Sequence, residues 1–169
     1  MPDISLRLAG PADKPVAERL WLMFRHDMSE VEGELPAPDG SFRDTRLHRA
    51  FADPDRAPYL LMSGDRPAGF AVVRGLTGRT RVMNSFFVVR GARRAGAGTQ
   101  AAQDLVARHP GAWEIAFQDA NRGAVRFWRR VATEIAGDAW TEERRPVPNH
   151  PDLAPDVWIS FSTTAGTAG

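Results

Sequence analysis

Near its middle the chain contains the loop Val88-Val89-Arg90-Gly91-Ala92-Arg93-Arg94-Ala95-Gly96-Ala97-Gly98-Thr99, which follows an apolar run and leads into a predicted helix. Arg93, Gly96 and Gly98 form the pattern R-x-x-G-x-G. Closely spaced glycines let the backbone turn with its N–H groups pointing inward, and a helix N-terminus adds about half a positive charge. This arrangement favours binding of a phosphate or pyrophosphate. The arginines of the loop indicate a ligand with more than one phosphate.

Two other phosphate-binding patterns compete with this interpretation. Residues 96–101 also fit the dinucleotide pattern G-x-G-x-x-G/A, with Glu114 or Asp119 as the acidic residue further along. In a dinucleotide-binding fold, however, the first glycine directly ends the first strand, whereas residues 90–95 intervene here. A Walker loop requires Gly-Lys-Ser/Thr, which residues 98–100 do not supply. A dinucleotide-binding protein remains an alternative.

The pattern of apolar residues on both sides of the loop predicts an α/β (α+β) fold with a mixed sheet. Short apolar or alternating runs predict strands at residues 4–8, 59–62, 68–73, 79–89, 113–117, 139–144 and 157–161. Helical spacing predicts helices at residues 13–28, 42–52, 98–108 and 121–131. The predicted order is therefore β-α-α-β-β-β-α-β-α-β-β.

Two further features complete the predicted organisation. In the first helix, Val16, Leu20, Met23 and Phe24 repeat at helical spacing and are expected to face inward. An acidic segment at 29–41, interrupted by glycines and prolines, is predicted to be a loop. Residues 1–162 are expected to form a single domain, followed by a disordered tail at 163–169.

Composition limits the classes of function. Of the 169 residues, 22 are basic and 21 are acidic, a net charge of +1, and every basic residue except Lys14 is an arginine. This balance argues against a nucleic-acid partner. The chain has no cysteine and its four histidines lie far apart, so no metal is expected. No apolar run reaches the ~18 residues that cross a bilayer, and residues 1–7 lack a signal-peptide pattern. We therefore expect a cytoplasmic protein without a membrane partner.

A second motif lies 28 residues after Arg93. It reads Asn121-Arg122-Gly123-Ala124-Val125-Arg126-Phe127-Trp128. Together, R-x-x-G-x-G and N-x-x-A-x-x-F-W, with a predicted strand between them, resemble the GCN5-related N-acetyltransferase (GNAT) superfamily, whose second element reads N-x-x-A-x-x-F-Y. The predicted order of elements is similar to that of the family over residues 4–162.

The resemblance implies an acyl-coenzyme A co-substrate, most often acetyl-CoA, in a notch where the two central parallel strands separate. Phe87, Val88 and Val89 would offer main-chain groups to the pantetheine and the acyl carbonyl. The pyrophosphate would be surrounded by Arg93, Arg94, Ala95, Gly96, Ala97, Gly98 and Thr99. Asn121 would reach the pantetheine arm, and Phe127 and Trp128 would line the thioester end. From the residues alone, Asn121 fits a helix cap equally well, and Phe127 fits the core.

The chain departs from the family pattern where the usual catalytic groups would lie. The tyrosine that often protonates the leaving thiolate is replaced by Trp128, whose indole is not an acid near neutral pH. The only tyrosine, Tyr59, belongs to an earlier strand. The strand before the loop has Asn84, Phe86 and Val88 on the relevant face and no carboxylate. We therefore expect transfer to proceed mainly by positioning and by hydrogen bonding of the carbonyl.

The remaining candidates for catalysis are Glu114, His26 and Asn84. Asp27 and Glu30 lie in an acidic run that would suit a cationic acceptor. The predicted function is direct acyl transfer to a small-molecule amine, without a covalent enzyme intermediate. A non-catalytic acyl-CoA-binding domain of the same fold is the alternative. The sequence leaves the acceptor, the acyl chain length and the oligomeric state open, whether monomer or homodimer.

Overall fold

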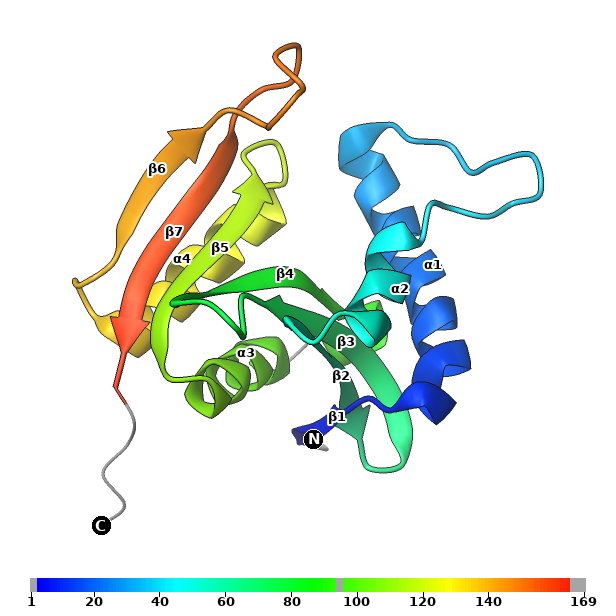
Figure 1. Cartoon of the computed structure of the whole chain (residues 1–169), viewed down its shortest axis with the longest axis horizontal. Helices are drawn as coiled ribbons and strands as arrows, with labels where there is room; N and C mark the ends of the chain where they lie inside the picture. The colour runs from blue at the N-terminus through cyan, green and yellow to red at the C-terminus, as the bar shows by residue number, and fades with distance from the viewer. Residues whose placement is uncertain (1–2, 94–95, 165–169) are drawn as a thin grey trace.

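The computed structural model of the chain describes residues 3–93 and 96–164. These residues form a seven-stranded sheet in the order β1-β2-β3-β4-β5-β7-β6 (Figure 1). The strands are β1 (Ile4–Leu8), β2 (Arg56–Ser63), β3 (Arg66–Arg74), β4 (Thr80–Val88), β5 (Gly111–Gln118), β6 (Thr141–Arg145) and β7 (Asp156–Thr163). The helices are α1 (Lys14–Glu32), α2 (Thr45–Ala52), α3 (Ala97–Arg108) and α4 (Arg122–Ala136), with short 3-10 turns η1 (Pro11–Asp13) and η2 (Arg90–Ala92). The predicted element order and mixed sheet are confirmed.

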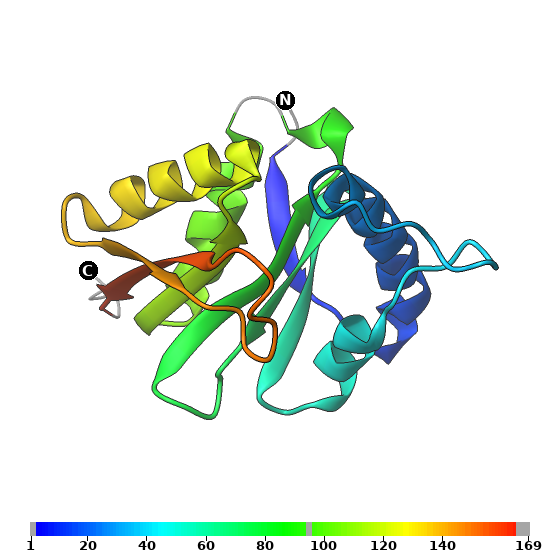
Figure 2. The ribbon, with the colours of Figure 1, turned by 90° about the horizontal axis from the view of Figure 1, so that it is seen from above.

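Helices cover both faces of the twisted sheet. Figure 2 shows α1 and α2 on one side and α3 and α4 on the other. The first side has a core of aromatic and aliphatic residues that includes Leu20, Trp21, Leu47 and Phe70. The second side has a larger core that includes Leu105, Trp113, Val131 and Ile159. Burial of these apolar side chains on both faces is the main favourable term in the stability of the layered structure.

The central strands β4 and β5 are parallel and separate part of the way along their length. They pair only over residues 80–83 of β4 and 112–115 of β5, although both strands continue. Asn84 interrupts the ladder on the other edge of β4, because Val72 pairs with Ser85 while Val73 pairs with Met83. Such a bulge bends a strand and increases its twist. Beyond Met83, none of the described strands pairs with the edge of β4 that faces β5, and a notch opens there.

Glycine at position 69 permits the close approach of β3 to β4. A Cβ atom at Gly69 would lie 2.0 Å from the carbonyl oxygen of Phe87, a distance that no side chain tolerates. Phe87 and Val88 end β4 at the notch. Gly69 thus fixes the position of the strand end that leads into the glycine-rich loop.

Several element boundaries differ from the prediction. Helix α1 continues to Glu32, so the first residues of the predicted loop 29–41 are helical, and the helix ends at Gly33 with a positive φ of 68°. Its buried face includes Ala17, Leu20 and Trp21, whereas Met23 is 50% exposed. The expectation that Met23 faces inward was wrong, because the buried stripe of α1 runs through Ala17, Leu20 and Trp21 instead. Helix α4 also extends beyond the predicted end, to Ala136.

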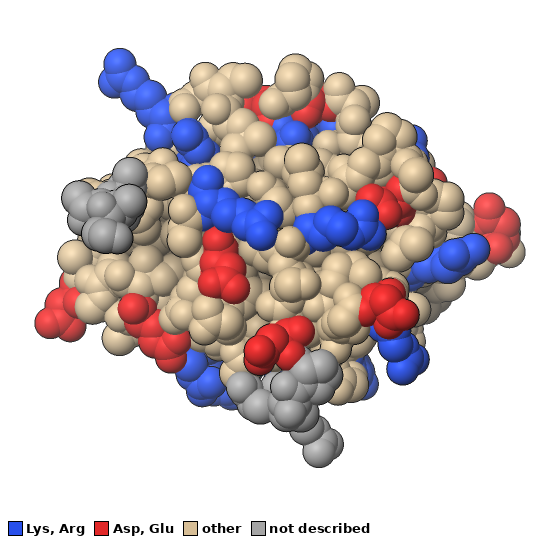
Figure 3. All heavy atoms as spheres, turned by 90° about the horizontal axis from the view of Figure 1, so that it is seen from below, with Lys and Arg blue, Asp and Glu red and all other residues tan. Residues whose placement is uncertain are grey.

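The chain end was predicted to be a tail from residue 163. Thr163 instead ends β7, and residues 165–169 lie outside the described part of the chain. No helix within the described ranges is both long and apolar enough to span a bilayer. On the face shown in Figure 3, basic and acidic side chains are interspersed, in keeping with the near-neutral net charge.

Candidate active site

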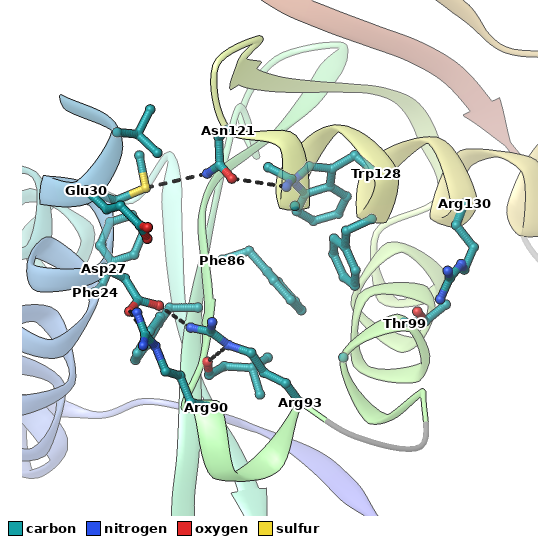
Figure 4. Close-up of a pocket in the computed structure, with 18 of the residues that line it drawn as sticks. Phe24, Asp27, Glu30, Phe86, Arg90, Arg93, Thr99, Asn121, Trp128 and Arg130 are labelled. Carbon is teal, nitrogen blue, oxygen red and sulfur yellow. Dashed lines mark hydrogen bonds and ion pairs between the residues drawn. The ribbon is translucent and has the colours of Figure 1, made fainter.

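The notch between β4 and β5 opens into a cavity of about 530 Å³ (Figure 4). Residues of α1, of β4 and the loop after it, and of the first turns of α3 and α4 form its walls. Of the residues predicted to hold a coenzyme, those lining the cavity are Phe87, Val88, Arg93, Gly96, Gly98, Thr99, Asn121, Phe127 and Trp128. Val89 and Ala97 are adjacent in sequence but do not line it, and the predictions for Arg94 and Ala95 fall outside the described residues.

Among the described residues, no side chain caps the N-terminus of α3, which lies at this cavity. Gly96 precedes the helix in a left-handed conformation with φ 75° and has no side chain to cover the first N–H groups. A Cβ atom at Gly98 would come within 3.4 Å of the Phe127 ring. Uncapped N–H groups and the helix dipole favour an anion at this position. The residues present therefore fit the pyrophosphate of a coenzyme.

Two arginines of the loop are held by a carboxylate of α1. Arg90 donates hydrogen bonds to Asp27 at 3.1 and 2.8 Å, and the guanidinium of Arg93 also pairs with Asp27. Arg93 Nε additionally donates to the carbonyl oxygen of Val88 at 2.7 Å. Although burial alone would raise it, the pKa of Asp27 is held below its usual range by Arg93 and Arg90. Asp27, predicted to contact a cationic acceptor, therefore lies in the first cavity with its charge already paired.

A further arginine in the first cavity was missed from the sequence. Arg130 on α4 lines the cavity and extends toward Thr99 at the start of α3 (Figure 4). It shares a helix face with Gly123 and Phe127, which are seven and three residues earlier. Helical periodicity from the N-x-x-A-x-x-F-W motif could have identified it.

Asn121 caps α4 and also lies at the wall of the first cavity. Its side-chain oxygen accepts a hydrogen bond from the Ala124 N–H at 3.1 Å and so caps α4. Its amide nitrogen lies 3.9 Å from the sulfur of Met28 on α1 (Figure 4). Asn121 also lines the cavity, so the cap and the cavity wall are the same side chain.

Three aromatic rings form the inner end of the first cavity. The ring centroids of Phe127 and Trp128 are 4.7 Å apart, and Phe86 lies 5.5 Å from Phe127 and 5.3 Å from Trp128. Trp128 is only 6% exposed, whereas Phe127 is partly buried. No hydrogen bond from the Trp128 indole N–H occurs among the described residues. This aromatic cluster, Phe86, Phe127 and Trp128, shields the inner end from water and leaves one N–H donor there.

A second cavity of about 400 Å³ adjoins the first. The two share six wall residues, namely Phe24, Met28, Phe86, Asn121, Ala124 and Trp128. The second cavity is otherwise formed by β4, β5 and the ends of α1, α2, β3 and β7. We call the shared wall the junction. The two cavities lie side by side where β4 and β5 separate.

The second cavity has charged groups at its rim. Glu32 is engaged by Arg25 at 2.7 Å and by Gln118 at 3.2 Å. The side chain of Asp156, the first residue of β7, has no hydrogen-bond or ion-pair partner in the described ranges. Burial and the negative charge of Glu32 raise the pKa of Asp156. Asp156 ends the proline-rich stretch 146–156 between β6 and β7, where no local sequence pattern distinguishes it.

The remaining predicted site residues are dispersed. Asn84 lines the second cavity, and its amide nitrogen is buried without a partner. Glu114 lies outside both cavities and pairs with Arg145. His26 is exposed and outside both cavities, and Glu30 is an exposed residue at the wall of the first.

Neither the tyrosine nor any metal-binding group contributes to these cavities within the described residues. Tyr59 lines neither cavity, and its hydroxyl is 2.8 Å from His109 Nε2. Within residues 3–93 and 96–164, no group of three or more His, Cys, Asp or Glu side chains is arranged to hold a metal ion.

Comparisons with known proteins agree with this geometry. Residues 17–132 match the family model described as the acetyltransferase (GNAT) family. Among solved structures, the chain is similar to an acetyltransferase from Thermus thermophilus, with TM-score 0.67 and 18% identity over 95% of this chain and 97% of that one. It is also similar to the aminoglycoside acetyltransferase AAC(6')-Ib in complex with coenzyme A, with TM-score 0.65 and 15% identity over 95% of each chain.

A third similar structure is the ribosomal-protein-S18-alanine N-acetyltransferase from Escherichia coli. Its TM-score is 0.62 with 11% identity, over 98% of this chain and 97% of that one. No curated protein matches the chain. At these identities, the structural likeness shows the fold alone.

Proposed function

Because the chain belongs to the acetyltransferase (GNAT) family, we propose that it transfers an acetyl group from acetyl-CoA to the nitrogen of a small-molecule amine. The observation that carries the proposal is the pair of cavities that meet at the junction. One cavity has an uncapped helix N-terminus and arginines at its wall, and the other has charged groups at its rim. This pairing suits a phosphate-bearing donor on one side and a polar acceptor on the other.

The first cavity would hold the coenzyme through main-chain and arginine contacts. The first N–H groups of α3 and the guanidinium of Arg130 would bind phosphates. The edge of β4 beyond Met83 lacks a strand partner and can donate and accept main-chain hydrogen bonds, as a sheet edge does with an added strand. Bound acetyl-CoA supplies the thioester, so that a C–N bond to the acceptor forms as the C–S bond breaks.

The chain would contribute positioning, exclusion of water and a proton acceptor. An ammonium must lose a proton before its nitrogen can attack, and the carboxylate of Asp156 is an unpaired base among the described groups of the second cavity. Its raised pKa makes it a stronger base than an ordinary aspartate. The indole N–H of Trp128 would donate a hydrogen bond at the junction, where the aromatic cluster keeps water out.

The test is release of free thiol from acetyl-CoA in the presence of a panel of primary amines. We expect turnover with at least one amine. We also expect Asp156→Asn to lower kcat about 100-fold, the size of a general-base contribution. Asp152→Asn, in the connection before β7 and outside both cavities, is the matched control.

Two outcomes would contradict the proposal. Tight binding of acetyl-CoA without turnover of any amine would favour a non-catalytic acyl-CoA-binding domain of the same fold. A change in tryptophan fluorescence on adding NAD(P)H, with none on adding acetyl-CoA, would favour a dinucleotide-binding protein.

A further inference from the structure

Four hydrogen-bond donors of the second cavity lack an acceptor among the described residues. Two are the guanidiniums of Arg46 on α2 and Arg74 at the end of β3. Neither guanidinium forms a hydrogen bond or ion pair with any residue that the structure describes. The others are the amide nitrogen of Asn84 and the hydroxyl of Ser85, both buried without a partner. A buried donor left unpaired costs roughly 1–3 kcal/mol, so such groups are uncommon without a function. The two buried donors of Asn84 and Ser85 lie at the same cavity as the exposed Arg46 and the half-buried Arg74, and together they point to a ligand that accepts hydrogen bonds.

Arg46 is exposed as a residue, but the groups around its guanidinium disfavour the positive charge. Its guanidinium lies 6.0 Å from the centre of the Trp21 ring. Burial lowers the pKa of Arg46, and the positive charges of Arg25, Arg56 and Arg74 lower it further, while Glu32 acts in the opposite direction. An anion between Arg46 and Arg74 would relieve this repulsion.

The acidic groups of the cavity do not fill that role. Both carboxylate oxygens of Glu32 are already engaged, one by Arg25 and the other by Gln118. Asp156 pairs in register with Gln118 at the far end of β5. Arg74 instead lies beside Val82 near the start of β4, and Val82 is opposite Glu114, four residues before Gln118. Four residues span about 13 Å along a strand, so Arg74 and Asp156 lie at opposite ends of the cavity.

Building on the proposed acetyltransferase function, we propose that the acceptor is an amine that also carries an anionic group, a carboxylate or a phosphate. Arg46 and Arg74 bind that group, with Ser85 and Asn84 donating to it or to polar atoms beside it. The amine then lies toward the junction, on the side of Asp156. Planar guanidiniums suit carboxylate and phosphate oxygens because they can donate two parallel hydrogen bonds. Phe86, at the junction, lies four residues beyond Val82 on β4, a span of about 13 Å. The Arg74 side chain covers part of this distance, and the rest leaves room for a spacer of a few carbons between the amine and the anionic group.

The experiment measures binding to the protein saturated with CoA, so that no turnover is required. Isothermal titration compares two matched pairs of probes, 4-aminobutyrate with 4-aminobutyramide and phosphoethanolamine with ethanolamine. We expect the anionic member of at least one pair to bind ten or more times as tightly as its neutral partner. The pair that shows the preference identifies the anion as carboxylate or phosphate.

Variants then show which residues cause the preference for the anionic probe. Arg46→Ala and Arg74→Ala should each reduce it about tenfold, and Arg46→Lys should restore part of it by keeping the charge without the planar fork. Arg49→Ala is the matched control, because Arg49 lies on the same helix outside the cavity. Circular dichroism and Tm confirm that each variant is folded.

The outcomes separate this inference from the proposed function. Equal binding of anionic and neutral probes, no binding of either, or a preference that survives in the Arg46→Ala/Arg74→Ala double variant overturns the inference. Acetylation of neutral amines with no anionic preference overturns it too, while leaving the proposed function standing. An arginine-dependent preference without acetylation of any amine supports the anion site and contradicts the acetyltransferase proposal.

Discussion

At the scale of single residues, Trp128 is the clearest departure from the family pattern. Its indole N–H can donate a hydrogen bond at the junction but cannot supply a proton near neutral pH. We expect Trp128→Phe to lower kcat/KM about tenfold, the value of one lost hydrogen bond. Trp128→Tyr, which keeps a donor, should stay within about threefold of the native value. Steady-state thiol release measures both. Equal loss in the two variants would mean that the indole acts by packing alone.

Arg130 gives a prediction about the coenzyme. It lines the first cavity near the start of α3 and is exposed, so its contact with a phosphate is partly screened by solvent. We expect Arg130→Ala to weaken acetyl-CoA binding about fivefold in a fluorescence titration. Arg126→Ala, one turn earlier on α4 and outside the cavity, should leave the affinity unchanged. Equal affinities for the two variants would remove Arg130 from the phosphate site.

Some of these residues could be predicted from the sequence and others could not. Arg93, Gly98 and Asn121 belong to two short motifs, and a motif lies within one loop or one helix turn. Arg46, Arg74 and Asp156 come from three elements far apart in the chain and line one cavity only after the sheet and α2 assemble. No local spacing relates them, so the charged rim of the second cavity becomes visible only in the folded structure.

At the scale of elements, the approach of β3 to β4 depends on Gly69. The Cβ of an alanine would overlap the Phe87 carbonyl oxygen, so the strands would have to separate at the end that positions the glycine-rich loop. We expect Gly69→Ala to cost about 2–3 kcal/mol and to lower Tm by about 4–12 °C. Thermal unfolding followed by circular dichroism measures this shift. Gly10→Ala, where a Cβ meets nothing within 4 Å, is the control. A Tm within about 1–2 °C of native for Gly69→Ala would show that the sheet adapts.

Element types were predictable where the apolar period was unambiguous. The strand of Trp113, Ile115 and Phe117 alternates cleanly, and the structure buries those three residues together. In α1, two overlapping stripes fit a helical period, one with Met23 and one with Trp21. Contacts with α2 and β3, for example Trp21 with Phe70, select the second stripe. The periodicity of one helix does not specify which elements pack against it, so tertiary contacts decide which stripe is buried.

At the scale of the whole molecule, His109 couples stability to pH. It follows α3, hydrogen bonds Tyr59 of β2 and accepts the Trp113 indole N–H of β5 through its carbonyl. Burial, with help from the positive charges of Arg81 and Arg108, lowers the pKa of His109. His109 therefore binds a proton more readily in the unfolded chain than in the folded protein. Its contribution to the free energy of unfolding is complete above a pH of about 6.5 and is lost as pH falls through its lowered pKa in the folded protein.

The corresponding measurement is Tm between about pH 7.5 and pH 5. We expect Tm to fall on acidification, and His109→Gln to flatten that fall over the same interval because glutamine does not titrate. His26→Gln is the control, since His26 is exposed. An unchanged slope in His109→Gln would assign the acid sensitivity to other groups.

The wall common to the two cavities bears on the order in which ligands bind. Phe86, Trp128 and Asn121 face both spaces, so a ligand seated in the larger cavity completes the floor of the smaller one. Acetyl-CoA should therefore bind first and CoA should leave last, a compulsory-order ternary-complex mechanism. Product inhibition would then be competitive for CoA against acetyl-CoA and noncompetitive against the amine. The separation of two strands would thus set the sequence of events in each catalytic cycle.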